Sequence, residues 1–98
     1  MRRYLLIRIY SENHTAISGE QFNDALLSSV RKYFGEIGVN TIVPKLLRFD
    51  PHRLEAIVAC QSREKDLQAA VALIREIAGS STAALTVRIS GTIKSLMT

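Results

Sequence analysis

The order in which the hydrophobic pattern changes its period most restricts what this chain can fold into. Strand periodicity or a strand-rich composition covers residues 3–11, 39–50, 53–61 and 83–90. Helical periodicity covers residues 18–35 and 63–79. The sequence therefore predicts the order strand, helix, strand, strand, helix, strand, with a loop at 80–82, in one domain spanning residues 1–98.

Local signals support these elements. Ser18 and Gln21 have the spacing of a capping box at the start of the first helix, and Gly35 or Gly38 can supply its left-handed stop. Ser62 is expected to cap the second helix. Turn residues at 50–53 join the second and third strands into a hairpin. Because Pro44 lacks the amide hydrogen that a central strand needs, the strand that contains it is expected at a sheet edge or with a bulge.

Right-handed crossovers turn this order into an α+β fold, a ferredoxin-like (RRM-like) β-α-β-β-α-β sandwich. Its four-stranded antiparallel sheet carries two helices on one face, and the first strand lies between the third and the last. Strand alternation assigns one set of side chains to the helix-covered face: Leu5, Ile7, Ile9, Leu85, Val87 and Ile89. The opposite set is Leu6, Arg8, Tyr10, Thr86, Arg88 and Ser90. That second face is either a partner surface or a solvated face.

The charge balance favours an anionic partner. Thirteen Lys and Arg residues against nine Asp and Glu residues give a net charge of +4, and nucleic acid is the commonest anionic partner of basic proteins. A solvated basic surface is the alternative. The single cysteine, Cys60, excludes an internal disulfide and fits a cytoplasmic location. The chain contains no apolar run long enough to span a membrane, so no membrane partner is expected.

Residue patterns typical of catalysis are missing from the sequence. The histidines, His14 and His52, lie in loop-like contexts, and Cys60 reads as a buried hydrophobic residue in a strand. No Cys or His spacing matches a metal site. RNA-recognition modules stack bases on aromatic residues of the third strand, and residues 53–61 contain none. If RNA binds, it binds through arginines, lysines, helix ends and loops.

The segment "GTIKS" (residues 91–95) lacks the upstream glycine of a phosphate-binding P-loop. Gly91 instead permits a tight turn after the last strand, and Thr92 can cap a short terminal helix. Lys94 is then expected near Arg88 and Arg8, where the three cations could contact a phosphate. A turn with a solvated lysine is the alternative.

Four segments together resemble ribonuclease P protein component 2, and the likeness covers nearly the whole chain. They are "RRYLLIRIYSEN", "ALLSSVRKYFG", "RLEAIVACQ" and "VRISGTIKSL". The resemblance implies a role in removing the 5′ leader from precursor tRNA, in which the RNA subunit is the catalyst and the protein stabilises the RNA core. The protein itself would have no catalytic residue and bind no cofactor, with Mg²⁺ held by the RNA subunit.

The resemblance also implies binding residues and partners. Arg2, Arg3, Arg8, Arg88 and Lys94 would contact RNA phosphates, and Gly91 would form the terminal turn. Further candidates on the hairpin are Lys45 and Arg48. The expected partners are ribonuclease P RNA, precursor tRNA and the TIM-barrel-like ribonuclease P protein component 3, in a heterotetramer that contains a homodimer of this chain. Leu6, Tyr10 and Ile57 would form the protein interface.

In one respect the chain departs from this family. Many relatives carry residues after the last strand that form a further helix, whereas this sequence ends at Thr98. Either the protein is naturally short or the contacts of that helix are absent. Two other functions stay open on the residues alone: a regulatory ferredoxin-like module that binds a small metabolite, and a protein–protein adaptor.

Overall fold

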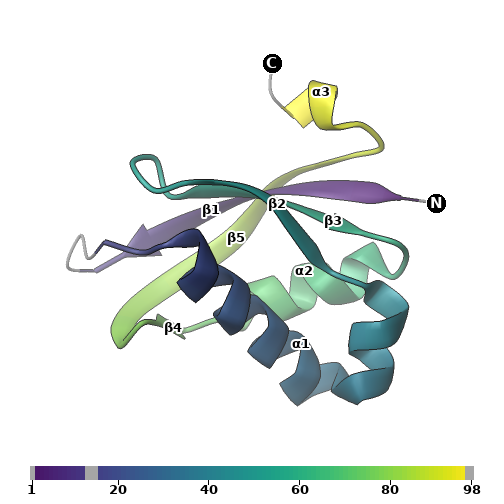
Figure 1. Ribbon diagram of the computed structural model, residues 1–98, viewed down its shortest axis with the longest axis horizontal. Helices are drawn as coiled ribbons and strands as arrows, with labels where there is room; N and C mark the ends of the chain where they lie inside the picture. Colours follow the sequence, from purple (N-terminus) through teal and green to yellow (C-terminus); the bar gives the residue numbers. More distant parts are fainter. Residues whose placement is uncertain (1, 13–15, 97–98) are drawn as a thin grey trace.

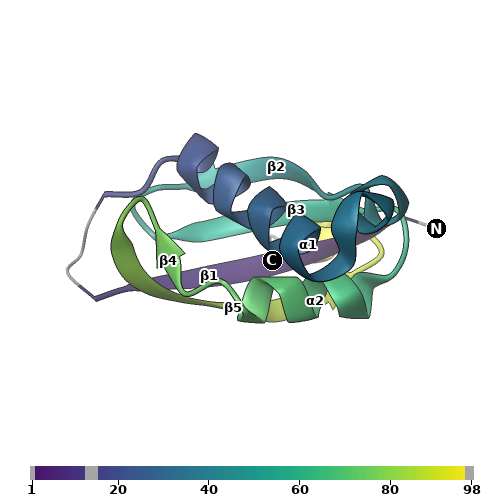
Figure 2. The same cartoon turned by 90° about the horizontal axis from the view of Figure 1, so that it is seen from below.

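The strands form one antiparallel sheet with helices on both faces. The computed structural model describes residues 2–12 and 16–96, and its elements follow in chain order: β1 (Arg3–Ser11), α1 (Gly19–Ile42), β2 (Lys45–Asp50), β3 (Glu55–Cys60), α2 (Glu64–Ala72), β4 (Glu76–Ile77), β5 (Ser80–Ser90) and α3 (Ile93–Leu96). The strand order is β2-β3-β1-β5-β4, so β1 lies between β3 and β5 as predicted. α1 and α2 cover one face, and α3 lies on the other (Figure 1, Figure 2).

The sheet has five strands rather than the four expected. Two observations account for the difference: α2 ends at Ala72, and residues 76–77 form the short strand β4, which pairs with Ser80 and Ser81. The turn between β4 and β5 places Ala78 and Gly79 at positive φ. Residues 63–79 were therefore wrongly predicted as one helix, and residues 80–82 wrongly as a loop. The apolar stripe remains buried, because Ile74 and Ile77 still reach the core.

The first helix begins as predicted and extends past its expected end. Ser18 accepts a hydrogen bond from the amide of Gln21, and the Gln21 side chain accepts one from the amide of Ser18, which completes the capping box. At Gly35 the backbone leaves helical geometry (φ 71°, ψ −173°), but a further helical segment runs to Ile42. The prediction of a strand from residue 39 was wrong there, because helical geometry buries Ile42 completely in the core.

Gly35 gives a testable consequence of this kink. We expect Gly35→Ala to lower the free energy of unfolding by about 1–3 kcal/mol, since φ of +71° with ψ of −173° is a backbone conformation that residues with a Cβ rarely adopt. Contact with other parts of the molecule adds nothing, because apart from the adjoining backbone no described atom lies within 4 Å of a Cβ built there. Urea denaturation compared with Lys32→Ala, an exposed position on α1, measures the difference. Equal stabilities would contradict this explanation of the kink.

The second helix begins differently from the prediction. Arg63, in left-handed geometry, occupies the N-cap position, and it makes no side-chain capping hydrogen bond. The hydroxyl of Ser62 instead donates to the carbonyl of Thr41, which ties the start of α2 to the end of α1. The expectation that Ser62 caps α2 was therefore wrong.

A β-bulge in β5 changes which residues face the helices. Leu6 lies opposite Arg88, but Ile7 lies opposite Thr86, so Val87 is an extra residue. In the part of β5 before Val87, the even-numbered residues lie on the same sheet face as the buried Ile7 and Ile9. After Val87, the odd-numbered Ile89 lies on that face, opposite Leu5. The alternation rule placed three residues on the wrong faces: Leu85 and Val87 are exposed, and the Thr86 hydroxyl is buried.

The core lies between the sheet and the two long helices. Its largest fully buried side chains include Leu5 and Ile7 of β1, Phe22 and Leu26 of α1, and Leu67 of α2. Phe22 of α1 stacks on Phe49 of β2 with ring centroids 5.8 Å apart. Among the described helices, none has the length and apolar character needed to cross a membrane.

Candidate nucleic-acid interface

The sheet face opposite α1 and α2, here called the open face, is built from three rows of paired residues. Strand register places Lys45, Ala59, Tyr4 and Ser90 in the first row. The second row is Arg48, Ile57, Leu6 and Arg88, and the third is Asp50, Glu55, Arg8 and Leu85. The second row therefore has an apolar centre with an arginine at each end.

α3 covers part of this face, which the two-layer prediction left bare. Thr92 caps α3 as predicted, since its Oγ1 accepts a hydrogen bond of 3.4 Å from the amide of Ser95. The guanidinium of Arg88 donates to the carbonyl oxygen of Ser95 at 3.0 Å and so ties α3 to β5. Leu96 is buried, and α3 contacts both β1 and β5.

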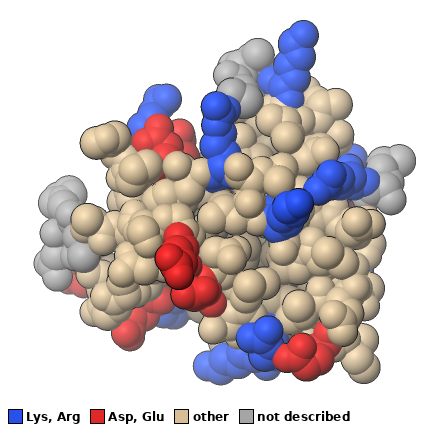
Figure 3. Space-filling view, viewed as in Figure 1, with Lys and Arg blue, Asp and Glu red and all other residues tan. Residues whose placement is uncertain are grey.

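Several predicted phosphate contacts lie on α3 or on the sheet face that it partly covers. Lys94 is exposed on α3 itself, close in sequence to Arg88 and to the turn at Gly91. Arg2 lies over the ring of Tyr4, with 5.9 Å between the guanidinium carbon and the ring centroid. Lys45 and Arg48 lie on β2, at the edge of the sheet. Figure 3 shows Lys and Arg side chains projecting from the side of the molecule that carries α3.

Two other candidate cations are paired with carboxylates. Arg3 Nε lies 2.6 Å from Glu64 Oε2 at the start of α2. Arg8 donates to Glu55 Oε2 at 2.7 Å from Nη2, and this hydrogen bond raises the pKa of the Arg8 guanidinium above its ordinary value. Arg8 thus lies on the open face, where the carboxylate of Glu55 neutralises part of its charge. The Arg3 side chain is directed toward Glu64 of α2.

A hollow of about 430 Å³ opens on this face between the β2–β3 turn and α3. Its lining residues are Leu6, Arg48, Phe49, Asp50, Pro51, Arg53, Glu55, Ile57 and Leu96. Asp50 Oδ1 accepts hydrogen bonds from the amides of His52 and Arg53, which form the predicted turn and lower the pKa of Asp50. Arg53 was not among the candidate site residues named from the sequence. Its position in the turn at 50–53 was the signal that could have indicated it.

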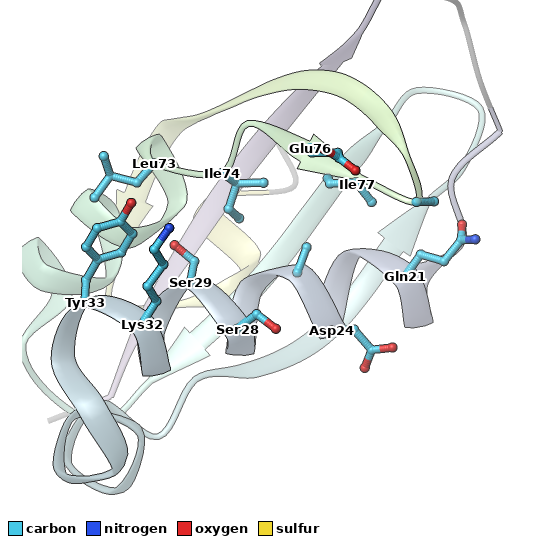
Figure 4. A pocket seen from close by; sticks show the side chains of 12 residues that line it. Gln21, Asp24, Ser28, Ser29, Lys32, Tyr33, Leu73, Ile74, Glu76 and Ile77 are labelled. Carbon is cyan, nitrogen blue, oxygen red and sulfur yellow. The ribbon is translucent and has the colours of Figure 1, made fainter.

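A second hollow, of about 440 Å³, lies on the helix-covered side between α1 and the segment that follows α2 (Figure 4). Figure 4 shows Lys32 of α1 along its wall together with the acidic side chains of Asp24 and Glu76. The Ser29 hydroxyl donates to the carbonyl of Ala70 at 2.7 Å. Because two carboxylates accompany the one lysine, this hollow is a weaker candidate for binding an RNA phosphate than the open face is.

The three expected protein-interface residues differ in accessibility. Tyr10 is exposed, Leu6 is half-buried, and Ile57 is buried with only 6% of its surface accessible. Within residues 2–12 and 16–96, no group of three or more His, Cys, Asp or Glu residues could hold a metal ion. His14 lies outside the described residues.

Comparison with known proteins identifies relatives over nearly the full chain. The sequence model of the Rpp14/Pop5 family matches residues 3–98. The chain is 26% identical over 96 residues to ribonuclease P protein component 2 of Pyrococcus furiosus, covering 97% of this chain and 78% of that protein. It is 30% identical over 95 residues to the protein of the same name from Pyrococcus horikoshii, covering 96% and 78%.

A solved structure shares the fold. A chain in the cryo-EM structure of yeast ribonuclease MRP superposes with a TM-score of 0.72 at 17% identity, covering 93% of this chain and 74% of that one. At this identity the likeness concerns the fold alone. The match across residues 3–98 and the two archaeal relatives confirm the resemblance seen in the sequence. The chain therefore belongs to the Rpp14/Pop5 family.

Proposed function

We propose that this chain binds the RNA of ribonuclease P through the open face around α3, and so stabilises the RNA that removes the 5′ leader from precursor tRNA. As a member of the Rpp14/Pop5 family, the chain is a ribonuclease P protein subunit. The observation that carries the RNA contact is the placement of Arg88 and Lys94 beside α3, with Lys45 and Arg48 across the same face. Phosphate contacts of this kind position RNA without reading its sequence.

In this proposal the protein is not the catalyst. The described residues contain no cluster of three or more potential metal ligands, and Cys60 is buried, with a pKa raised by burial. A buried thiol with a raised pKa is a poor nucleophile. The family resemblance assigns catalysis to the RNA, which would also hold the Mg²⁺ ions, and the protein would lower the repulsion between RNA phosphates.

The remaining partners are proposed from the family resemblance. Ribonuclease P protein component 3 would bind this chain, and two such pairs would form a heterotetramer through a homodimer. Tyr10 is half-exposed and offers an accessible aromatic contact, whereas Leu6 and Ile57 contribute only through the hollow that they line. The complex would act in the cytoplasm. Family membership favours this function over a metabolite-binding module or a general adaptor.

Reconstitution tests the proposed function. Ribonuclease P RNA and its component 3 are assayed with and without this protein, and cleavage of precursor tRNA is measured across a Mg²⁺ titration. We expect the protein to shift the curve to lower Mg²⁺, because added cations replace part of the ionic screening. RNA binding should also weaken steeply with salt. Identical Mg²⁺ curves with and without the protein would contradict the proposal.

A further inference from the structure

The hollow between the β2–β3 turn and α3 combines an apolar wall with a polar one. Leu6 and Ile57 are paired neighbours at the centre of the open face, and Leu96 of α3 lines the same hollow. Arg48, Arg53, Asp50 and Glu55 form the polar part of the lining. Its volume of about 430 Å³ lies within the range typical of small-ligand sites, about 300–1,000 Å³.

The charges of the hollow argue against a phosphate as its occupant. Two arginines and two carboxylates line it, so their formal charges cancel. Glu55 is also paired with Arg8 at 2.7 Å, and its other oxygen lies 3.8 Å from Arg53 Nε. An anion placed inside would meet both carboxylates. The fitting ligand is neutral and flat, with apolar faces and hydrogen-bonding edges.

We propose that this hollow receives one unpaired nucleobase of the bound RNA, whose phosphates lie on the cations around it. The inference rests on the proposed function, because it gives the RNA-binding face a site for a base. One face of the base would lie against the half-buried side chain of Leu6, beside the small accessible edges of Ile57 and Leu96. Arg53 or Arg48 of the lining would stack its guanidinium on the other face, in the place that aromatic residues take in other RNA-binding domains. The Phe49 ring is not that surface, because it stacks on Phe22.

The carboxylates favour bases that carry an amino group. Asp50 uses Oδ1 for two backbone amides, and backbone hydrogen bonds keep its pKa below the ordinary value, so it stays ionised at neutral pH. An ionised carboxylate accepts hydrogen bonds and donates none. The exocyclic amines of adenine, cytosine and guanine can donate to it, whereas uracil has no such amine. We therefore expect oligoadenylate to bind more tightly than oligouridylate.

The test compares single-stranded RNA oligomers of equal length and charge. Wild-type protein is titrated with oligoadenylate, with oligouridylate, and with an oligomer in which every base is absent. We expect the abasic oligomer to bind about tenfold more weakly than oligoadenylate, the loss expected when one base contact worth about 1.4 kcal/mol disappears. Equal affinity of all three oligomers would overturn the inference.

Methyl NMR places the contact. Oligoadenylate should shift the methyl signals of Leu6, Ile57 and Leu96, and leave those of Leu85 unchanged, since Leu85 is exposed on the same face outside the hollow. Shifts at Leu85 alone would overturn the inference. So would shifts of the hollow produced by the component 3 protein and not by RNA, because the occupant would then be a protein side chain.

A matched pair of variants completes the experiment. Leu6→Ala should abolish most of the preference for oligoadenylate over the abasic oligomer, whereas Leu85→Ala should keep it. Thermal denaturation shows whether either variant is folded, and the wild-type comparison stands if Leu6→Ala is not. Failure of the inference alone leaves salt-dependent RNA binding and the Mg²⁺ shift intact. Failure of the proposed function removes both.

Discussion

Replacing Arg88 and Lys94 together by alanine is expected to weaken binding to ribonuclease P RNA by about tenfold or more, since a hydrogen bond to a charged group contributes about 1.5–3 kcal/mol. The dependence of log affinity on log salt should become shallower by about two, one for each lost phosphate contact. The reconstituted enzyme should then need more Mg²⁺. Filter binding at several salt concentrations and precursor-tRNA cleavage measure these effects.

A control of equal charge makes this result specific. Lys32 of α1 and Lys65 of α2 are both exposed and lie on the helices that cover the opposite face. The double variant Lys32→Ala, Lys65→Ala removes the same two charges from that side. We expect it to bind RNA with nearly the wild-type salt dependence. Equal losses in the two double variants would mean that net charge, and not the open face, governs binding.

The single variants separate two roles of Arg88. Its guanidinium holds the carbonyl of Ser95, so Arg88→Ala also loosens α3. Lys94→Ala keeps that hydrogen bond and removes one charge. If Lys94→Ala leaves the salt dependence unchanged while Arg88→Ala weakens binding, Arg88 acts by anchoring α3 and the phosphate assignment of Lys94 is wrong.

Phe22→Ala is expected to lower the free energy of unfolding by about 3–5 kcal/mol, the usual cost of removing a buried phenylalanine. Phe22 is completely buried, and its ring stacks on Phe49 with an interplanar angle of 25°. This contact joins α1 to β2, so its loss affects both layers. Because small domains are stable by about 5–15 kcal/mol in total, the variant would lose much of its stability. Urea denaturation followed by circular dichroism measures the change.

Tyr33→Ala provides the matched control on the same helix. Its side chain is 45% exposed and contributes little to the core, so we expect a change of about 0.5 kcal/mol or less. A similar loss of stability in both variants would show that burial in the core does not set the size of the loss, because alanine is the better helix former at either position. A loss below about 1 kcal/mol for Phe22→Ala would contradict the burial described above.

Local signals predicted the elements whose causes are local. β1 has the predicted bounds, the capping box at Ser18 forms, and Asp50 closes the hairpin turn through two backbone amides. β2 lies at a sheet edge and carries a bulge at Leu47, as Pro44 suggested. The strand bounds, the cap and the turn depend on residues within a few positions of one another, which is why a single sequence is enough to find them.

Tertiary contacts decided the elements that were predicted wrongly. Residues 39–42 have β-rich composition, yet a helical turn buries Ile42 and lets the carbonyls of Thr41 and Ile42 accept hydrogen bonds from residues 62 and 61. In the same way Ile77 fits a helical stripe in the sequence but pairs with Ser80 in a strand. Periodicity alone does not distinguish these outcomes, because either structure buries the same side chains.

The sequence indicated which residues could form the candidate site, but not how the fold arranges them. The short helix capped by Thr92 forms as predicted, and the contact of the basic residues around the terminal turn with RNA stays a prediction. The ion pairs of Arg3 and Arg8, the cover that α3 provides and the hollow lined by Leu96 depend on strand register and on contacts between distant residues. Such features cannot be obtained from residue spacing along one chain.

The extra residue at Val87 affects how this family should be aligned. Residues 80–86 and 88–90 follow two different phases of the strand, although they read as one continuous alternation. If a sequence alignment places a gap of one position between these two parts, the columns on one side of the gap match inward-facing residues of one protein with outward-facing residues of another. Positions equivalent to Arg88 would then be compared with core positions of relatives. Family comparisons of the cations in this strand are therefore meaningful only when the two parts are aligned separately.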